Sequence, residues 1–253
     1  MAGSQAYKWE TLSCSMPSYN ALVRRVIRES DIVLIVVDIR TAMEVDLSLI
    51  RTEVQRAGKK YLYVLSKADL FDGDIKEIRL KPFITVSASK RISTRALVRK
   101  LMEIGHGEEI VVGVVGLPNA GKSTLINALK GSRAASTSPI SGHTKGIQHI
   151  RISPKILLVD TPGVLAGQHP TTRLKAAAID ASKVKDAEAA ASNLIGALEG
   201  AVEAHYGVET HEDTYETIEA IGQKLGMLRK GGVDMDRASR KIIKDWQDGR
   251  IKV

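Results

Sequence analysis

The chain has 253 residues, of which 43% are hydrophobic and 26% charged, enough apolar material for a substantial core. Its one cysteine, Cys14, excludes an intrachain disulfide and a zinc site built from several cysteines. No apolar run reaches the roughly 20 residues that span a bilayer, and residues 1–15 lack the basic-then-apolar pattern of a signal peptide. We therefore expect a cytoplasmic protein without a membrane-spanning segment.

The formal net charge of +8 is unevenly distributed along the chain. Residues 1–164 carry 24 Lys and Arg against 15 Asp and Glu, whereas residues 165–253 carry 13 against 14. A basic excess favours a polyanionic partner, because binding releases counterions from a phosphate backbone. Charge alone leaves two readings open, a nucleic-acid partner or a local positive field for a small phosphate ligand.

Before Gly163, short apolar runs rich in β-branched residues alternate with helical patterns. The predicted strands cover residues 31–38, 60–66, 83–87, 110–116 and 155–160, and the predicted helices lie near residues 44–57, 91–104 and 122–130. This alternation is typical of a doubly wound α/β fold with a mostly parallel sheet.

After Gly163 the sequence changes to Ala-, Glu- and Lys-rich helix formers. Helices are predicted around residues 182–204, 212–225 and 234–247, with no strand among them, and Asp234 or Asp236 is expected to cap the last. We place a domain boundary near residue 165, so that residues 1–165 form the α/β domain and residues 166–253 a small all-α domain.

A phosphate-binding loop is predicted between a strand and a helix, where Gly116-Leu-Pro-Asn-Ala-Gly121-Lys122-Ser123 matches G-x-x-x-x-G-K-[ST]. Glycines let backbone N–H groups turn toward phosphate oxygens, and the helix N-terminus adds partial positive charge. Lys122 would bridge the outer phosphates, and the Ser123 hydroxyl would coordinate Mg²⁺. The residues expected to contact the phosphates are Asn119, Ala120, Gly121, Lys122, Ser123 and Thr124.

Asp160-Thr-Pro-Gly163 follows the next apolar strand, about 37 residues beyond the phosphate loop. We expect Asp160 to hold Mg²⁺ through water, and the Gly163 N–H to donate to the γ-phosphate. Between the two motifs lies a loop-like stretch, residues 136–146, from which Thr144 is the predicted third Mg²⁺ contact. Lys122, Thr144 and Gly163 would together form the catalytic set.

Two further loops at strand ends indicate guanine recognition. Ser66-Lys67-Ala68-Asp69 resembles the N-K-x-D guanine motif of translation-factor-related GTPases. Asp69 would accept hydrogen bonds from guanine N1–H and N2–H₂, a donor pair that adenine lacks, each worth roughly 1.5–3 kcal/mol. Lys67 would lay its aliphatic stem along the base. Ser66 replaces the usual Asn and thereby removes an amide that could tie loops together, so we expect weaker affinity with specificity retained.

The second loop, Ser87-Ala88-Ser89, resembles the S-A-K loop of the same proteins, in which the Ala88 backbone N–H would meet guanine O6. Either motif alone is a weak signal, but both stand at strand ends in the right mutual order. Both precede the phosphate loop, whereas the common order places the phosphate loop first. The motif order therefore predicts a circular permutation of a P-loop GTPase, with the former ends joined near residues 102–109.

This order resembles that of the circularly permuted GTPases of the YlqF/RbgA type, which act in maturation of the large ribosomal subunit. Val37-Asp38-Ile39-Arg40 is similar to the D-A-R segment of that family, and residues 228–251 to its helical C-terminal tail. The resemblance implies bound GTP or GDP with Mg²⁺, an rRNA or large-subunit partner, and no membrane. We expect a monomer. The tail implies an RNA-contacting face, for which the candidates are Arg237, Arg240, Lys241, Lys244 and Arg250; a solvated helix surface is the alternative.

This chain lacks two side chains that GTPases resembling it use, or are proposed to use, in hydrolysis. Val164 stands where many members of the superfamily have a water-positioning Gln, and the N-terminal stretch Ser13-Cys-Ser-Met-Pro-Ser-Tyr lacks the histidine of bacterial relatives. His143, Gln168 and His169 are expected to be ordinary loop residues. Asn119 resembles the asparagine that binds K⁺ in cation-activated GTPases, so K⁺ is a candidate cofactor that would neutralise transition-state charge.

The leading hypothesis is a slow GTPase stimulated by the ribosomal subunit or RNA, in which the γ-phosphate orders residues 136–168 and reorients the helical domain. A second hypothesis is a nucleotide-gated RNA- or ribosome-binding protein with negligible hydrolysis of its own, which Val164 favours. A third, a P-loop kinase or ATPase, is opposed by Asp69 and by the lack of a lid-like arginine cluster. The rRNA site and the assembly step remain open at this point.

Overall fold

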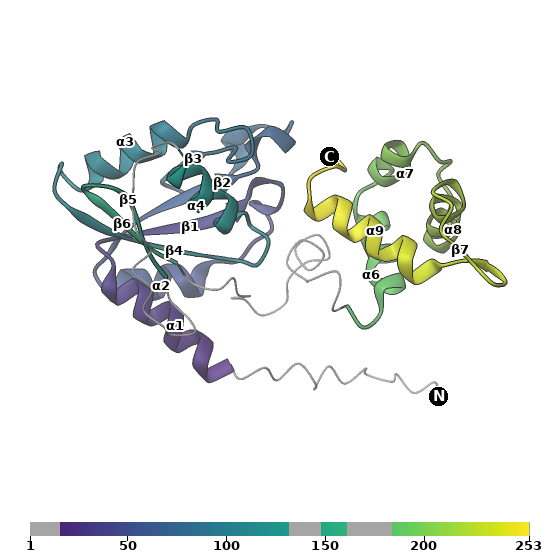
Figure 1. Ribbon diagram of the computed structural model, residues 1–253, viewed down its shortest axis with the longest axis horizontal. Coiled ribbons are helices and arrows are strands. Elements are labelled where there is room, and N and C mark those ends of the chain that lie inside the picture. The colour runs from purple at the N-terminus through teal and green to yellow at the C-terminus, as the bar shows by residue number, and fades with distance from the viewer. Residues whose placement is uncertain (1–15, 132–147, 161–183, 253) are drawn as a thin grey trace.

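The computed structural model describes residues 16–131, 148–160 and 184–252. Its larger part is a six-stranded sheet in the order β3-β2-β1-β4-β6-β5 (Figure 1). All neighbouring strands run parallel except β5, which is antiparallel to β6. The strands are β1 (Ile32–Asp38), β2 (Lys60–Ser66), β3 (Phe83–Thr85), β4 (Ile110–Gly116), β5 (Gln148–Ser153) and β6 (Ile156–Asp160). The doubly wound, mostly parallel sheet predicted from the sequence is confirmed.

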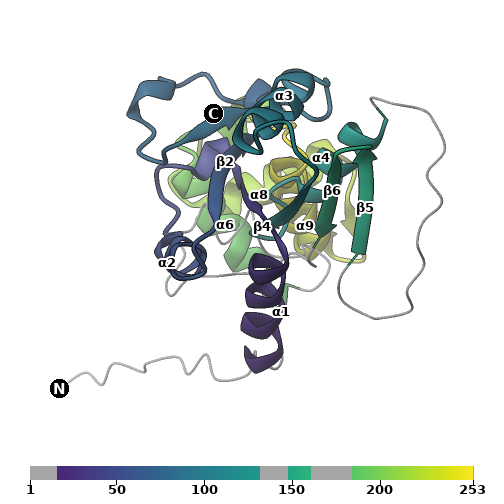
Figure 2. The ribbon, with the colours of Figure 1, turned by 90° about the vertical axis from the view of Figure 1, so that its left-hand side faces the viewer.

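Helices cover both faces of the sheet, which explains why its central strands are apolar on both sides (Figure 2). On one face, α3 (Thr94–Ile104) and α4 (Lys122–Lys130) pack against alternate strand residues such as Leu34 and Val114. On the other, α1 (Met16–Glu29) and α2 (Ser48–Arg56) pack against the intervening residues, such as Ile35 and Val115. The sheet therefore has two hydrophobic layers, and its loops at the strand ends are left for a ligand.

The edge strand β5 is an addition to the predicted strands. Its sequence alternates exposed His149 and Arg151 with the more buried Ile150 and Ile152. This alternation is the pattern of an edge strand with one solvated face, and it is weaker than the continuous apolar runs of the central strands.

The C-terminal part is a bundle of α6 (Ala187–Ala197), α7 (Ala201–Tyr206), α8 (Thr214–Lys224) and α9 (Met235–Gln247). The first predicted helix is divided in two at Gly200, which has a φ of 90° that favours glycine. Asp234, one of the two proposed caps, accepts a hydrogen bond from the Arg237 N–H at 3.1 Å and so begins α9. Trp246 lies fully buried in the core that these helices share.

The absence of strands predicted for this part is wrong. Leu228–Arg229 (β7) and Gly232–Val233 (β8) pair antiparallel and form a short hairpin between α8 and α9. Lys230 and Gly231 make its turn, and Gly231 (φ 96°) and Gly232 (φ 142°) both have positive φ. These two glycines thus allow the chain to reverse.

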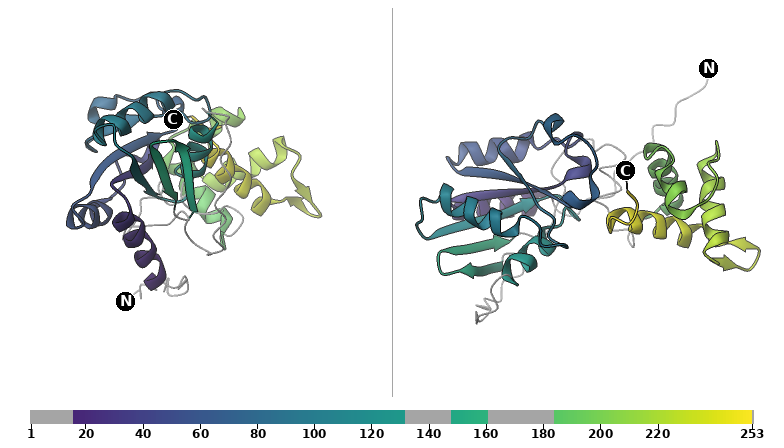
Figure 3. Two further views of the ribbon diagram at one scale, coloured as in Figure 1. Left: turned by 60° about the vertical axis from the view of Figure 1, so that its left-hand side comes forward. Right: turned by 90° about the horizontal axis from the view of Figure 1, so that it is seen from above.

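The two parts meet where α9 ends, beside the carboxyl ends of β1 and β2 (Figure 3). The hairpin lies at the opposite end of α9, away from the sheet (Figure 1). The predicted boundary near residue 165 lies outside the described residues. Among the helices of residues 16–131, 148–160 and 184–252, none is both long and apolar enough to cross a membrane.

Candidate guanine-nucleotide site

The predicted phosphate loop lies between β4 and α4, as the motif requires. Gly116 ends β4 with a φ of 151°, and a Cβ there would stand 2.2 Å from the Val36 carbonyl oxygen of the neighbouring strand. Asn119 and Gly121 have φ values of 55° and 90°, so the loop passes twice through the left-handed region. Alternation of this kind turns successive N–H groups toward one point, which creates a concave site for anions.

Lys122 begins α4 and is only 6% exposed. Its ammonium donates to the carbonyl oxygens of Gly116 (3.0 Å) and Leu117 (2.6 Å), so the side chain folds back over the loop. Burial lowers the pKa of Lys122 from 10.5 to about 8, partly offset by the negative charge of Asp160. The lysine is therefore desolvated and positioned inside the loop, where a phosphate oxygen would compete with the two carbonyls.

The donor set for a magnesium ion consists of hard oxygens. The Ser123 hydroxyl is exposed on the first turn of α4, and the Asp160 carboxylate ends β6, whose pairing with β4 sets Asp160 opposite Val114. Hydroxyl and carboxylate oxygens are suitable ligands for Mg²⁺ that also contacts substrate phosphates. Within the described residues, no group of three or more His, Cys, Asp or Glu side chains forms a separate metal site. Thr144 and Gly163, predicted to complete this end, lie outside the described residues.

The Ser66-Lys67-Ala68-Asp69 loop leaves the end of β2 with Lys67 in the left-handed region (φ 55°) and continues into the short 3-10 helix η2 (Ala68–Leu70). Asp69 is partly buried, and its carboxylate interacts with the Ser87 hydroxyl and with the Lys90 ammonium at 3.3 Å. Burial raises the pKa of Asp69, but these hydrogen bonds and the positive charge outweigh it and hold the pKa below its ordinary value. Asp69 is therefore an ionised acceptor, the state that guanine N–H groups would require.

Ser66 keeps a connection that the sequence predicted to be lost. Its hydroxyl lies 2.5 Å from the Ala120 carbonyl oxygen of the phosphate loop and 2.9 Å from the Val37 carbonyl oxygen of β1. A hydroxyl has one proton, so it donates to one of these oxygens at a time. The two loops therefore stay connected through the buried serine, and the predicted weaker affinity stays a prediction.

The second base loop closes tightly after β3. Ser87 and Ile92 exchange backbone hydrogen bonds of 3.2 and 2.9 Å, and the Ser87 and Ser89 hydroxyls lie 3.3 Å apart. The Ala68 N–H donates to the Val86 carbonyl oxygen, which fixes this loop beside η2. The structure therefore brings together the two predicted base loops and, through Ser66, the phosphate loop. Asn119 and Thr124 are both exposed at the phosphate end.

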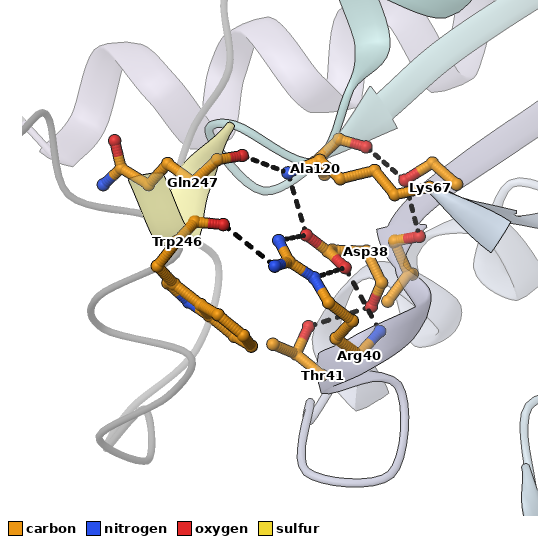
Figure 4. A network of polar contacts seen from close by, with 9 residues as sticks. Asp38, Arg40, Thr41, Lys67, Ala120, Trp246 and Gln247 are labelled. Atoms are coloured by element: carbon orange, nitrogen blue, oxygen red, sulfur yellow. Dashed lines mark hydrogen bonds and ion pairs between the residues drawn. The ribbon is translucent and has the colours of Figure 1, made fainter. Parts of the chain in front are cut away.

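A buried ionic network beside the base loop was missed by the sequence reasoning (Figure 4). Arg40 donates to both carboxylate oxygens of Asp38 at 3.0 and 2.7 Å, and Lys67 lies 2.9 Å from the same carboxylate. Burial raises the pKa of Asp38, but Arg40 and Lys67 outweigh it and hold the pKa below its ordinary value. The D-A-R-like segment was the available signal, but its partners on α9 are about 200 residues away and could not be read from it.

Four of the five basic residues proposed as an RNA face are ion-paired. Arg240 pairs with Asp236, and Lys244 with Asp248. Lys241 and Arg250 both pair with the buried Asp245. Arg237 is exposed and makes no ion pair within the described parts of the chain. This pattern favours the alternative of a solvated, charge-balanced surface for most of α9.

Known proteins resemble this chain over nearly its whole length. The family described as 50S ribosome-binding GTPase matches residues 111–224. An uncharacterized GTP-binding protein of Methanocaldococcus jannaschii is 36% identical over 91% of this chain, and guanine nucleotide-binding protein-like 3-like protein of Bos taurus is 27% identical over 92%. The chain spans 65% of the archaeal relative and 48% of the bovine one.

Solved structures agree with the fold. GNP-bound YlqF from T. maritima superposes with a TM-score of 0.61 at 24% identity, covering 93% of this chain and 95% of that one. GDP-bound YlqF gives a TM-score of 0.58 at 25% identity, covering 91% and 95%. With the base loops before the phosphate loop and both at the carboxyl ends of one sheet, the chain has the fold and the motif order of the circularly permuted YlqF GTPase structures that it is similar to.

Proposed function

We propose that this protein binds and hydrolyses GTP as a switch in assembly of the large ribosomal subunit. The observation that carries the proposal is the single site formed by the phosphate loop and both base loops, joined where Ser66 meets the Ala120 carbonyl oxygen. A site that combines a phosphate cradle with an ionised Asp69 suits a guanine nucleotide, because adenine would leave that carboxylate without donors. ATP-dependent functions are thereby disfavoured.

At the phosphate end, Lys122 would exchange its two carbonyl partners for β- and γ-phosphate oxygens. Ser123 and Asp160, together with Thr144, would hold Mg²⁺, which neutralises charge on the phosphates. Water would attack the γ-phosphorus, the bond to the bridging oxygen would break, and GDP and phosphate would leave. We propose that Gly163 donates to the γ-phosphate and that K⁺ beside Asn119 lowers the barrier.

At the base end, Asp69 would accept from guanine N1–H and N2–H₂, and the Ala88 backbone N–H would donate to O6. Ser87 and Ser89 shape this loop, and Lys67 would lie along the base. Specificity of this kind rests on paired hydrogen bonds whose loss costs about 1.5–3 kcal/mol each when one partner is charged. The base end thus discriminates nucleotides, whereas the phosphate end supplies affinity and chemistry.

Ribosomal action is supported by the names of similar proteins. The matching family is described as 50S ribosome-binding, and a protein named nucleolar GTP-binding protein 2, from Cryptococcus neoformans var. grubii, is 29% identical over 90% of this chain. We propose an rRNA or large-subunit partner, with residues 136–168 transmitting the nucleotide state to the helical domain across a boundary near residue 165. A monomeric, cytoplasmic protein fits this role.

For the RNA contact, the structure favours the hairpin over the middle of α9. Arg229 and Lys230 are exposed on the hairpin and, like Arg237 on the first turn of α9, make no ion pair within the described residues. Unpaired cations release more phosphate counterions on binding than cations already held by carboxylates. Leu228 beside them is 64% exposed and can add apolar contact.

The deciding measurement is GTP hydrolysis in K⁺ buffer, with and without large ribosomal subunits from the same source. Stimulation of roughly tenfold or more, equal to about 1.4 kcal/mol of barrier, would support an assembly GTPase. Replacing K⁺ by Na⁺ in the same assay tests the ion, and the Asn119→Ala variant should respond less to that exchange.

The alternative function, a nucleotide-gated binding protein with negligible hydrolysis, rests on Val164, which cannot orient a water molecule. It predicts nucleotide-dependent subunit binding without stimulated turnover. Subunit binding measured with GDP and with a non-hydrolysable GTP analogue separates the two functions. Absence of both binding and stimulation would overturn the ribosomal role and leave guanine-nucleotide binding intact.

A further inference from the structure

The C-terminal end of α9 lies against the loop that carries the guanine motif (Figure 4). The Gln247 carbonyl oxygen accepts from the Lys67 ammonium at 3.0 Å, and the Trp246 carbonyl oxygen accepts from Arg40 at 2.8 Å. Gly249 touches η2 so closely that a Cβ there would lie 2.0 Å from a Leu70 methyl carbon. Three contacts thus connect the helical domain to the segment proposed to hold the base.

These contacts are electrostatically favourable for a helix end. The carbonyls of the last turn have no partner within the helix, and the helix dipole gives this end partial negative charge. Arg40 and Lys67 bring two cations to those carbonyls. The Lys67 side chain is 18% exposed, so little water competes for its ammonium.

Asp38 is the centre that holds both cations. The Asp38 side chain is 4% exposed and the Arg40 side chain is 0% exposed. Arg40 donates a hydrogen bond to each of the two carboxylate oxygens of Asp38. The guanidinium also lies over the Trp246 ring, 3.9 Å from its centroid. The network therefore fixes the direction in which the Lys67 side chain leaves its left-handed backbone position.

We propose that Asp38 and the C-terminal end of α9 position Lys67 for the guanine base, so that base binding and docking of the helical domain stabilise each other. This inference rests on the base loop proposed above. It adds a second route between nucleotide and helical domain, independent of the γ-phosphate. Because the route runs through the base loop, GDP and GTP would use it alike.

Two consequences follow from linkage. A lysine already held by Asp38 and Gln247 loses less conformational freedom when its stem meets a base, so docking raises affinity for guanine nucleotides. By reciprocity, a guanine nucleotide strengthens docking by the same factor. A ligand that fills only the phosphate loop gains nothing from either effect.

The Gly249→Ala variant tests the first consequence. The branch carbon and both methyl carbons of Leu70 lie within 3.3 Å of the added Cβ position, so the end of α9 is pushed from the base loop without removal of any polar group. We expect GDP to bind about fivefold or more weakly and pyrophosphate to bind unchanged. Adding Leu70→Ala, which makes room for the methyl group, should restore GDP affinity.

Gly226→Ala is the matched control, because Gly226 also follows a helix with positive φ (65° against 76° at Gly249) but has nothing within 4 Å of its Cβ position. It shares the backbone strain and lacks the contact, so GDP affinity should stay at the wild-type value. Equal losses in the two variants, or parallel losses for GDP and pyrophosphate in Gly249→Ala, would overturn the proposal.

Hydrogen exchange in the wild-type protein tests the reciprocal effect without a variant. GDP should slow exchange of the amides of Gly249 and Arg250, which donate to the Trp246 and Asp245 carbonyl oxygens, and pyrophosphate should not. The same protection by both ligands would contradict the proposal. Failure of the underlying base site would appear separately, as equal wild-type affinity for GDP and ADP.

Discussion

The two ends of the candidate nucleotide site are built in different ways. At the phosphate end, the loop that would hold the phosphates comes from one continuous segment, in which β4, a left-handed loop and the first turn of α4 follow one another. The base end is assembled from two loops, one after β2 and one after β3. The last turn of α9 contacts the first of these loops through the hydrogen bond from Lys67 to the Gln247 carbonyl oxygen. One end is therefore a local structure, and the other depends on tertiary contacts.

This difference indicates where the helical domain would influence a bound nucleotide. The backbone of the phosphate loop is fixed by its neighbours, since Gly116 lies directly against β1. The base loop instead contacts the end of α9, through the hydrogen bond from Lys67 to the Gln247 carbonyl oxygen and through Leu70, which lies against Gly249. Perturbations of the helical domain should therefore change base recognition more than phosphate binding.

The largest effect is expected from Arg40→Leu at the base end. It leaves the buried Asp38 carboxylate with Lys67 as its remaining cation, and removing one partner of a buried pair typically costs about 3–5 kcal/mol. Urea unfolding should show a loss of this order. Arg56→Leu, which removes a side chain that is 73% exposed, should change stability by less than about 0.5 kcal/mol. Comparable small losses in both would mean that the network contributes little.

Asp69→Asn should weaken GDP binding roughly 100-fold, about 2.7 kcal/mol, because an amide replaces an ionised acceptor of two hydrogen bonds. Pyrophosphate affinity, which reports the phosphate end alone, should remain unchanged. Titration calorimetry with both ligands measures the split, and Asp72→Asn, an exposed aspartate nearby, serves as control. A parallel loss for both ligands would contradict the separation of the two ends.

At the phosphate end, binding should depend on pH through Lys122. Its pKa is lowered from 10.5 to about 8, and the charged form binds phosphate, so GDP affinity should fall about fourfold between pH 7 and 8.5. Folding stability should respond in the opposite direction. Between about pH 8 and 10.5 the unfolded chain holds this proton and the folded chain does not, so the contribution of Lys122 to stability rises with pH.

The check on this prediction is Lys130→Met, at the exposed end of the same helix, which should keep the wild-type pH profile. Flat GDP affinity across this pH range would show that Lys122 keeps its full charge. The same titration in Asp160→Asn should lower the midpoint, because the Asp160 charge raises the lysine pKa.

The smallest effect is expected from Lys244→Ala on the outer face of α9. Its ion pair with Asp248 spans 3.6 Å between exposed side chains, and such pairs contribute about 0–1 kcal/mol. Stability, GDP affinity and pyrophosphate affinity should all remain close to wild type. A marked loss of RNA or subunit binding in this variant would instead restore the middle of α9 as the contact face, against the hairpin residues Arg229 and Lys230.

Features that depend on neighbouring residues could be predicted from the sequence. Continuous apolar runs identify strands covered on both faces, and the glycine–lysine spacing after residue 115 predicts the phosphate loop, because backbone conformation there is a local property. The motif order likewise predicts the permutation. Edge strand β5 and the hairpin were missed, since a short half-solvated strand and a glycine turn give weak local signals.

Contacts between distant groups depend on how the helices and loops pack together. The packing brings the Ser66 hydroxyl to the Ala120 carbonyl oxygen, a contact that the sequence did not predict. A short side chain can make this contact because Ser66 is buried close to the phosphate loop. The packing also joins Asp38 and Arg40 to Trp246, a contact between residues about 200 positions apart that no spacing rule encodes. Charged side chains carry no periodic signal of their partners, so their pairing follows from the packing of α9 against the base loop.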